Sequence, residues 1–242
     1  MKTKQLIALT FGCLIAQGAM AQSTKTVPVL PKGCESQISS NGLYCSARVV
    51  TGDKATVTFA AVVSRDSFPT VDSILDRYTN FARWSEYAKT SPNTVIEFKQ
   101  GGSVALEPIT NAAGVETLRH VYDYSLKIQG IPLLKQSVRG ITYNTIVTPY
   151  SGALASLEFA AQTAPVPGFQ EKPKGLKSQT GSIHAVVCDP TVLEVCDDSK
   201  WLLVYETTVQ PDVSFAMNIA ANTVTAGIED LLVGMLDESI TN

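Results

Sequence analysis

The sequence predicts an α+β fold in which a curved antiparallel sheet of about six or seven strands wraps around a long C-terminal helix. Three features lead to this prediction: a first strand followed by two short helices, a middle region of alternating strands, and an amphipathic helix at the end. An amphipathic helix of this length needs a large apolar surface against it, and only the sheet offers one. The sheet must therefore curve, because a flat sheet would leave most of its apolar face in water.

The first elements follow from residue type and spacing. A β-branched run predicts a strand over 56–63, and apolar residues spaced three and four apart over 70–89 predict two short helices divided near Asn80. The period then changes to two, and Gly101 with Gly102 predicts a turn after the next strand. Further strands are expected over 116–128, 136–148, 153–162, 182–187 and 200–209.

The last part of the chain combines a polar loop and a long helix. Residues 165–181 are rich in proline, glycine and lysine, and we expect a loop there. After Pro211, apolar residues recur at three and four as far as 237, which predicts the C-terminal helix. The neighbouring acids Glu229 and Asp230 are expected on its solvent side, without the apolar surroundings that raise a carboxyl pKa.

Residues 1–21 have the order of a secretory signal peptide. Lys2 and Lys4 precede an apolar run over 6–15, and the small residues Ala19 and Ala21 mark a cleavage site. The apolar run is too short to span a bilayer. We therefore expect cleavage after Ala21 and a periplasmic or secreted mature protein.

The cysteines indicate structural disulfides in an oxidising compartment. Cys13 lies in the signal peptide, which leaves an even number of cysteines that could pair in three ways. Proximity in the sequence favours Cys34 with Cys45 and Cys188 with Cys196. The first pair lies in a segment over 22–51 that we expect to be an N-terminal extension, followed by a domain over 52–242. The chain has no C-x-x-C pattern or Cys/His cluster, so a metal site is not predicted.

Composition and motifs argue against several classes of function. A net charge of −3 does not favour nucleic-acid binding. The sequence has no phosphate-binding glycine loop and no H-E-x-x-H pattern, so we expect no cofactor. A serine hydrolase is also not favoured, because the string from Gly101 to Ala105 lacks the last glycine of a nucleophile elbow. We therefore assign no catalytic residue.

One segment carries a resemblance to a known superfamily. Residues 74–87, with Asn80, Phe81, Trp84 and Tyr87 at the matching positions, resemble the START-like, polyketide cyclase-type superfamily, whose fold is the helix-grip. The resemblance covers roughly residues 55–237 and suggests an exported bacterial member. It implies a hydrophobic or amphipathic, lipid-like molecule held between the sheet and the C-terminal helix. A minority of the superfamily catalyses cyclisation or hydrolysis.

The candidate ligand-binding residues come from the strand over 116–128 and from the elements expected near it. His120, Tyr122 and Tyr124 share one face of that strand, where one imidazole and two hydroxyls could orient the polar head of a ligand. Arg139 could pair with a carboxylate on the ligand. Trp84, Phe215 and Ile219 are the apolar residues assigned to the same site. His184, near a strand end, is expected at the surface.

The favoured function is an exported binding or carrier protein for a hydrophobic small molecule or lipid, with no nucleic acid as partner. The lysines and Phe169 of the loop over 165–181 allow for transient membrane contact, and the sequence names no protein partner. One alternative is a cyclase or hydratase that uses the same cavity, with His120 as acid or base. The other is a solidly packed module that binds another protein of the cell envelope through this loop or through the N-terminal extension.

Overall fold

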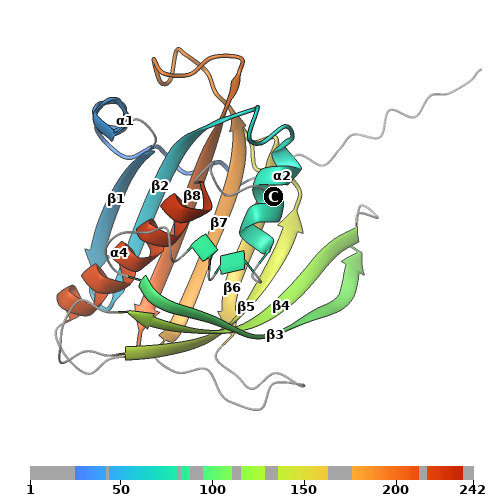
Figure 1. Cartoon of the computed structure of the whole chain (residues 1–242), viewed down its shortest axis with the longest axis vertical. Coiled ribbons are helices and arrows are strands. Elements are labelled where there is room, and N and C mark those ends of the chain that lie inside the picture. Colours follow the sequence, from blue (N-terminus) through green and yellow to red (C-terminus); the bar gives the residue numbers. More distant parts are fainter. Residues whose placement is uncertain are drawn as a thin grey trace, which may run out of the picture.

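The computed structural model describes residues 25–41, 44–80, 83–84, 86–87, 95–110, 116–128, 136–162, 176–212 and 217–236. Within these residues, one eight-stranded antiparallel sheet has the order β1-β2-β8-β7-β6-β5-β4-β3 (Figure 1). The strands are β1 Tyr44–Thr51, β2 Lys54–Ser64, β3 Val95–Thr110, β4 Glu116–Ile128, β5 Gln136–Val147, β6 Ala155–Gln162, β7 Leu176–Val187 and β8 Lys200–Pro211. The helices are α1 Cys34–Asn41, α2 Val71–Thr79 and α4 Met217–Met235.

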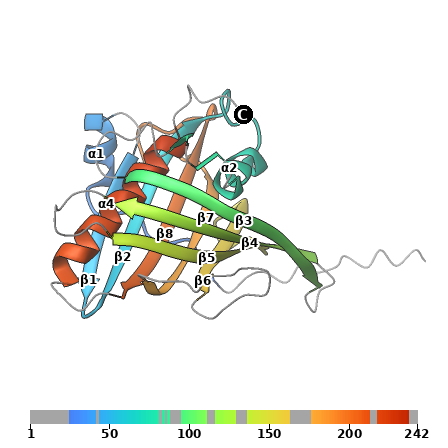
Figure 2. The ribbon, with the colours of Figure 1, turned by 60° about the horizontal axis from the view of Figure 1, so that its bottom comes forward.

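The sheet is curved so strongly that both of its edges reach the same helix. Helix α4 packs against β1, β2 and β8, and it also packs against β3 and β4 at the opposite edge. Figure 2 shows α4 lying between these two parts of the sheet. The predicted α+β helix-grip class is thereby confirmed, with eight strands in place of the six or seven expected.

The additional strand comes from the segment expected to be an N-terminal extension. Residues 44–51 form β1, which pairs with β2 from Tyr44 opposite Ala61 to Thr51 opposite Lys54. Gly52, with a φ of 61°, lies in the tight turn between the two strands, where glycine adopts a positive φ without strain. The domain boundary expected at residue 52 therefore falls inside a β-hairpin.

Two glycine-containing segments that were predicted as turn or loop contain strand residues. Strand β3 continues through Gly101 and Gly102, and a shift in its register with β4 between Gln100 and Gly102 shows a bulge there. Of the loop expected over 165–181, residues 176–181 are strand instead, because β7 begins at Leu176, and residues 165–175 lie outside the described residues. Glycine occurs within strands where the strand has a bulge or where another group approaches the backbone closely, so these glycines do not require a turn.

Gly181 in β7 illustrates such a reason. A Cβ atom at this position would lie 2.2 Å from Cζ of Phe159 and 2.4 Å from the backbone oxygen of Glu206. Phe159 is directly opposite Gly181 in the β6–β7 pair. The glycine therefore leaves the space that the aromatic ring occupies.

The main core lies on the face of the sheet turned toward α2 and α4, which we call the inner face. Its fully buried members include Phe59 on β2, Leu157 on β6 and Ile183 on β7. Tyr78 of α2 packs on Phe159 and Tyr205, with ring centroids 5.5 and 6.0 Å away. Helix α2 contacts β6 and β7, so these aromatic rings fill the space between helix and sheet.

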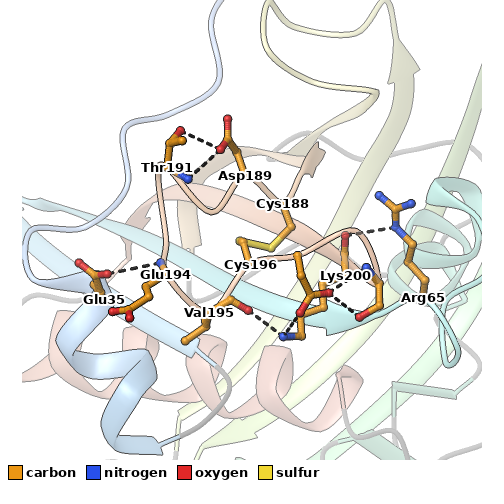
Figure 3. The surroundings of a disulfide bond; sticks show 11 residues. Glu35, Arg65, Cys188, Asp189, Thr191, Glu194, Val195, Cys196 and Lys200 are labelled. Atoms are coloured by element: carbon orange, nitrogen blue, oxygen red, sulfur yellow. Dashed lines mark hydrogen bonds and ion pairs between the residues drawn. A yellow bond between two sulfur atoms is a disulfide. The ribbon is translucent and has the colours of Figure 1, made fainter.

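A second apolar cluster covers part of the opposite, outer face. It contains Val204 and its neighbours on β2 and β8, together with Ile38 of α1. Two disulfides, Cys34–Cys45 and Cys188–Cys196, belong to this cluster, and both are the pairs favoured by the sequence. Figure 3 shows the loop closed by the second disulfide. The ammonium of Lys200, which follows this loop at the start of β8, donates to the backbone oxygen of Val195.

The structure shows two features that the sequence analysis also considered: the disulfides and the hydropathy of the helices. Its two disulfides are compatible with an oxidising compartment. In the described part of the chain, no helix is both long and apolar enough to cross a membrane. The expected signal peptide over 1–21 lies outside the described residues.

Candidate functional site

The segment that carries the superfamily resemblance forms a corner between α2 and the sheet. The hydroxyl of Thr70 caps α2 by accepting from the backbone N–H of Ser73 at 3.2 Å. The chain then turns back, and the indole N–H of Trp84 donates to the backbone oxygen of Tyr78 at 3.0 Å. The Trp84 ring meets the Tyr78 ring edge-on, with centroids 5.5 Å apart. The described side chains of this segment therefore stabilise the corner, and the ligand contact expected of Trp84 stays a prediction.

Arg77 joins α2 to the end of α4. Its side chain is 5% exposed, its Nη1 donates to the backbone oxygen of Met235 at 2.8 Å, and its guanidinium lies 4.9 Å from the ring centroid of Phe68. A cation is favourable at the C-terminal end of a helix, where backbone carbonyls lack partners. Arg77 was not predicted as a site residue; the available signal was an arginine among the apolar positions of a helix.

The interior next to this contact is almost completely filled. A residual cavity of about 10 Å³ lies among nine side chains: Phe68, Ile74, Arg77, Tyr78, Ile183, Leu203, Leu232, Met235 and Leu236. A cavity of this size holds no more than about one water molecule. A lipid-like ligand therefore has no room between α2, the last turns of α4 and strands β7 and β8.

The sheet register places His120 on the inner face. His120 is directly opposite Asn144 in the β4–β5 pair, and Asn144 is directly opposite Phe159 in the β5–β6 pair. Directly opposite residues of antiparallel strands lie on the same face of a sheet, and Phe159 belongs to the main core. Tyr122 and Tyr124 follow at intervals of two on the same strand, so they share this face.

The remaining candidates are distributed differently. Arg139 is directly opposite Ser125, one position along from Tyr124, and therefore lies on the other face of the sheet. Ile219 is in the first turn of α4. Phe215 lies outside the described residues. Backbone placement alone thus groups the three candidates on β4, and the roles of all these residues in binding stay predictions.

Asp230 of α4 was expected on the solvent side of its helix, but the residue is half-buried and one of its carboxylate oxygens is enclosed. Its Oδ2 atom is buried and has no hydrogen-bond partner. At about 100° per residue, Asp230 lies roughly 150° around the helix from the mean direction of Leu231, Leu232 and Met235, which pack into the main core. The Oδ2 atom of this half-buried residue is therefore enclosed on another side of α4, away from the main core. The sequence could not show this, because a solvent side was inferred without knowing that the sheet contacts α4 from two directions.

Glu229, next to Asp230, has an altered acidity. Partial burial raises the pKa of Glu229, a hydrogen bond from Ser46 and the charge of Arg48 act in the opposite direction, and the charge of Asp230 raises it further. The net effect is a pKa above the ordinary value of a glutamate. The middle of α4 thus carries two adjacent carboxyl groups that are both partly removed from water.

His184 lies in a buried polar network on the outer face. It was expected at the surface, but it is completely buried. Its Nδ1 is 2.9 Å from the hydroxyl of Ser156, and its Nε2 is 2.9 Å from the hydroxyl of Ser182. Burial lowers the pKa of His184 to about 4, and the charge of Glu158 only partly opposes this effect. His184 is buried in the tertiary structure because the Tyr150 ring packs on it, with the two ring centroids 4.4 Å apart.

The same network extends to the segment before α1. The Tyr150 hydroxyl donates to Oε1 of Glu158 at 2.5 Å, and the Lys25 ammonium forms an ion pair with the same oxygen. Partial burial acts to raise the pKa of Glu158, but the hydrogen bonds from Lys25 and Tyr150 leave it below its usual value. The backbone around Lys25 is held by Ser151, whose N–H donates to the backbone oxygen of Lys25 at 2.8 Å and whose backbone oxygen accepts from the N–H of Val27 at 3.3 Å. Among the described residues, no group of histidine, cysteine and acidic side chains could hold a metal ion.

Comparison with known proteins gives only distant structural matches. No family model and no curated protein matches this sequence. Among solved structures, a START superfamily protein from Mycobacterium smegmatis is 12% identical with a TM-score of 0.39, covering 80% of this chain and 94% of its own. The lipid transfer and protein localization domain of human StarD13 (DLC2) is 8% identical with a TM-score of 0.43, covering 83% and 93%. Ara h 8.0201 is 8% identical with a TM-score of 0.33, covering 75% and 95%.

These similarities are too low to assign an activity. The fold rests instead on the strand order of the sheet and on the packing of α4 against both of its edges. By these features, the chain has an α+β helix-grip fold.

Proposed function

We propose that this chain is an exported binding protein for an amphipathic, lipid-like small molecule, held between α4 and the inner face of β3, β4 and β5. Three observations favour this part of the interior. Both edges of the sheet pack against α4, so β3 and β4 lie against the same helix as β1, β2 and β8. The interior beside α2 is filled. The register places His120, Tyr122 and Tyr124 on the inner face of β4.

The observation that carries the proposal is the buried Oδ2 of Asp230. A buried carboxylate oxygen without a hydrogen bond costs free energy, on the order of 1–3 kcal/mol or more for a charged group. Native proteins leave few such atoms unpaired, so each one calls for an explanation. A ligand with a hydroxyl or amine at its polar end would supply the donor that Asp230 lacks. Its apolar part would then be buried along α4 and β4, at about 25 cal/mol per Å².

Native mass spectrometry tests this proposal. The protein is purified from the compartment to which it is exported, and any bound compound is extracted into organic solvent. We expect a stoichiometric lipid-like mass that is lost in Asp230→Ala and retained in Asp198→Ala, whose carboxylate is exposed on a loop. The same measurement gives the mass of the mature protein and so tests cleavage after Ala21.

A second matched pair tests the face of β4. His120→Ala should weaken retention of the compound, whereas Arg119→Ala, one position earlier on the alternate face, should leave it unchanged. A clean apoprotein mass after incubation with total lipid extract would contradict the proposal and favour the packed interaction module. A compound whose covalent structure has changed during incubation with the protein would favour the cyclase or hydratase.

A further inference from the structure

The outer face of the sheet contains a cleft that is separate from the proposed lipid site. It has a volume of about 420 Å³ and lies where β6, β7 and β8 are not covered by α1 or by the Cys188–Cys196 loop. Pockets that bind small molecules start at about 300 Å³. Its lining residues are Lys25, Tyr150, Glu158, Phe159, Ala160, Thr180, Gly181, Ser182, Glu206 and Thr208.

The register explains why a cleft forms at this point. Glu158, Ser182 and Glu206 are directly opposite one another on β6, β7 and β8, so a short side chain lies between two long ones. The next row has Ala160 and Thr180, which are also short. Neighbouring strands lie about 4.8 Å apart, so the two glutamates form opposite walls with backbones roughly 10 Å apart.

The charges of the two walls are not balanced. On the Glu158 side of the cleft, one carboxylate oxygen pairs with the ammonium of Lys25 and accepts a hydrogen bond from the hydroxyl of Tyr150. The Glu206 wall has a single described donor, the hydroxyl of Thr58 at 3.3 Å from Oε2. Glu206 is half-buried, and no described cation forms an ion pair with it. The cleft therefore contains one carboxylate whose charge the described residues do not neutralise.

The floor supplies further acceptors and a small apolar surface. The hydroxyl of Ser182 is fixed by His184 at 2.9 Å, and Ser182 is 8% exposed. Thr180 and Ala160 are exposed beside it. A metal ion does not suit this arrangement, because the described residues offer no group of three or more metal-ligating side chains and the carboxylates lie on opposite walls.

We propose that this cleft binds an organic cation, through a primary ammonium or guanidinium group that pairs with Glu206. Charge-assisted hydrogen bonds to a carboxylate are among the stronger polar contacts in proteins. The hydroxyls of Ser182 and Thr180 accept further hydrogen bonds from the same group, and its aliphatic part covers Ala160 and Gly181. The cation is a free small molecule or a basic side chain of a peptide, since both present the same chemistry.

Isothermal titration calorimetry of the full chain tests this proposal. The probes are 1,4-diaminobutane, 1-amino-4-guanidinobutane and an acetylated, amidated tri-lysine peptide, with 1,4-butanediol as the neutral analogue. We expect the cations to bind, the diol not to bind, and affinity to fall as salt is added. Tighter binding of the small amines assigns a free cation, and tighter binding of the peptide assigns a basic partner.

Two variants locate the site. Glu206→Gln should weaken binding at least tenfold, whereas Glu194→Gln, which makes the same charge change at an exposed loop position, should not. Thr180→Trp fills the cleft from an exposed position without changing charge, and it should also abolish binding. The proposal is overturned if no cation binds at millimolar concentration, or if Glu206→Gln and Thr180→Trp both bind like the wild type. Retention of lipid on the inner face, measured in parallel, separates this outcome from a failure of the proposed function.

Discussion

Protonation of His184 is expected to destabilise the protein as the pH falls below 6.5. The folded state holds the neutral ring, because both nitrogens bond to serine hydroxyls in a buried site and its pKa is lowered to about 4. We assign Nε2 as the protonated nitrogen, since the Ser156 hydroxyl accepts from the backbone N–H of Tyr150 and can donate to Nδ1. In the unfolded chain the histidine has a pKa of 6.5, so as the pH falls the unfolded state takes up a proton before the folded state does.

The size of the effect follows from these two pKa values. The contribution of neutral His184 to the free energy of unfolding is fully present above pH 6.5. It is lost progressively down to about pH 4, where the folded state also takes up the proton. The linkage relation gives a loss of about 2 kcal/mol between pH 7 and 5, and about 3 kcal/mol by pH 4. Carboxyl groups titrate in the same range, so only a comparison with a variant isolates the histidine.

Urea unfolding of the wild type and of His184→Asn, followed by circular dichroism from pH 7 to 4, measures this effect. The variant is less stable at pH 7, because it loses at least one serine hydrogen bond. The difference between the two proteins should shrink by about 2 kcal/mol at pH 5. Parallel stability curves, with a difference that does not change with pH, would refute the assignment of a neutral buried histidine.

Three further perturbations have expected outcomes. Gly181→Ala should lower stability by about 2 kcal/mol or more in urea unfolding, since its Cβ would overlap the Phe159 ring; an unchanged midpoint would contradict the close packing of Gly181. Arg77→Met should cost about 2–3 kcal/mol by leaving the backbone oxygen of Met235 without this buried donor, and it should increase hydrogen exchange at the end of α4. Replacing both cysteines of the Cys188–Cys196 bridge by serine should cost about 2–3 kcal/mol in thermal or urea unfolding; equal stability of the reduced and oxidised wild type would argue against a stabilising bridge.

Local patterns predicted most of the elements. Alternating and β-branched residues located the strands over 116–128 and 136–148 to within a residue, because a half-buried strand shows its period directly in the sequence. The spacing of apolar residues located α4, and closeness in the chain identified both disulfides. Strand β1 was missed because it lies among polar and glycine-rich residues and is recognised only by its pairing with β2.

The candidate sites depended more strongly on contacts between distant residues. The alternation on β4 predicted that His120, Tyr122 and Tyr124 share a face, but only the register through β5 to Phe159 identified that face as the inner one. Arg139 lies on the face opposite to that of His120, Tyr122 and Tyr124. The pattern of one strand does not show this, because it does not give the register of that strand with its neighbour.

The amino-acid sequence by itself determined the periods of the strands and helices, the order of these elements and the nearest cysteine pairs, because each depends on residues close together in the chain. Only the tertiary structure decided which polar groups are buried. His184 and Asp230 both looked exposed in the sequence, but His184 is completely buried and one carboxylate oxygen of Asp230 is enclosed. Burial depends on what the rest of the chain places against a residue, and the outer cleft arises in the same way from side chains on three neighbouring strands.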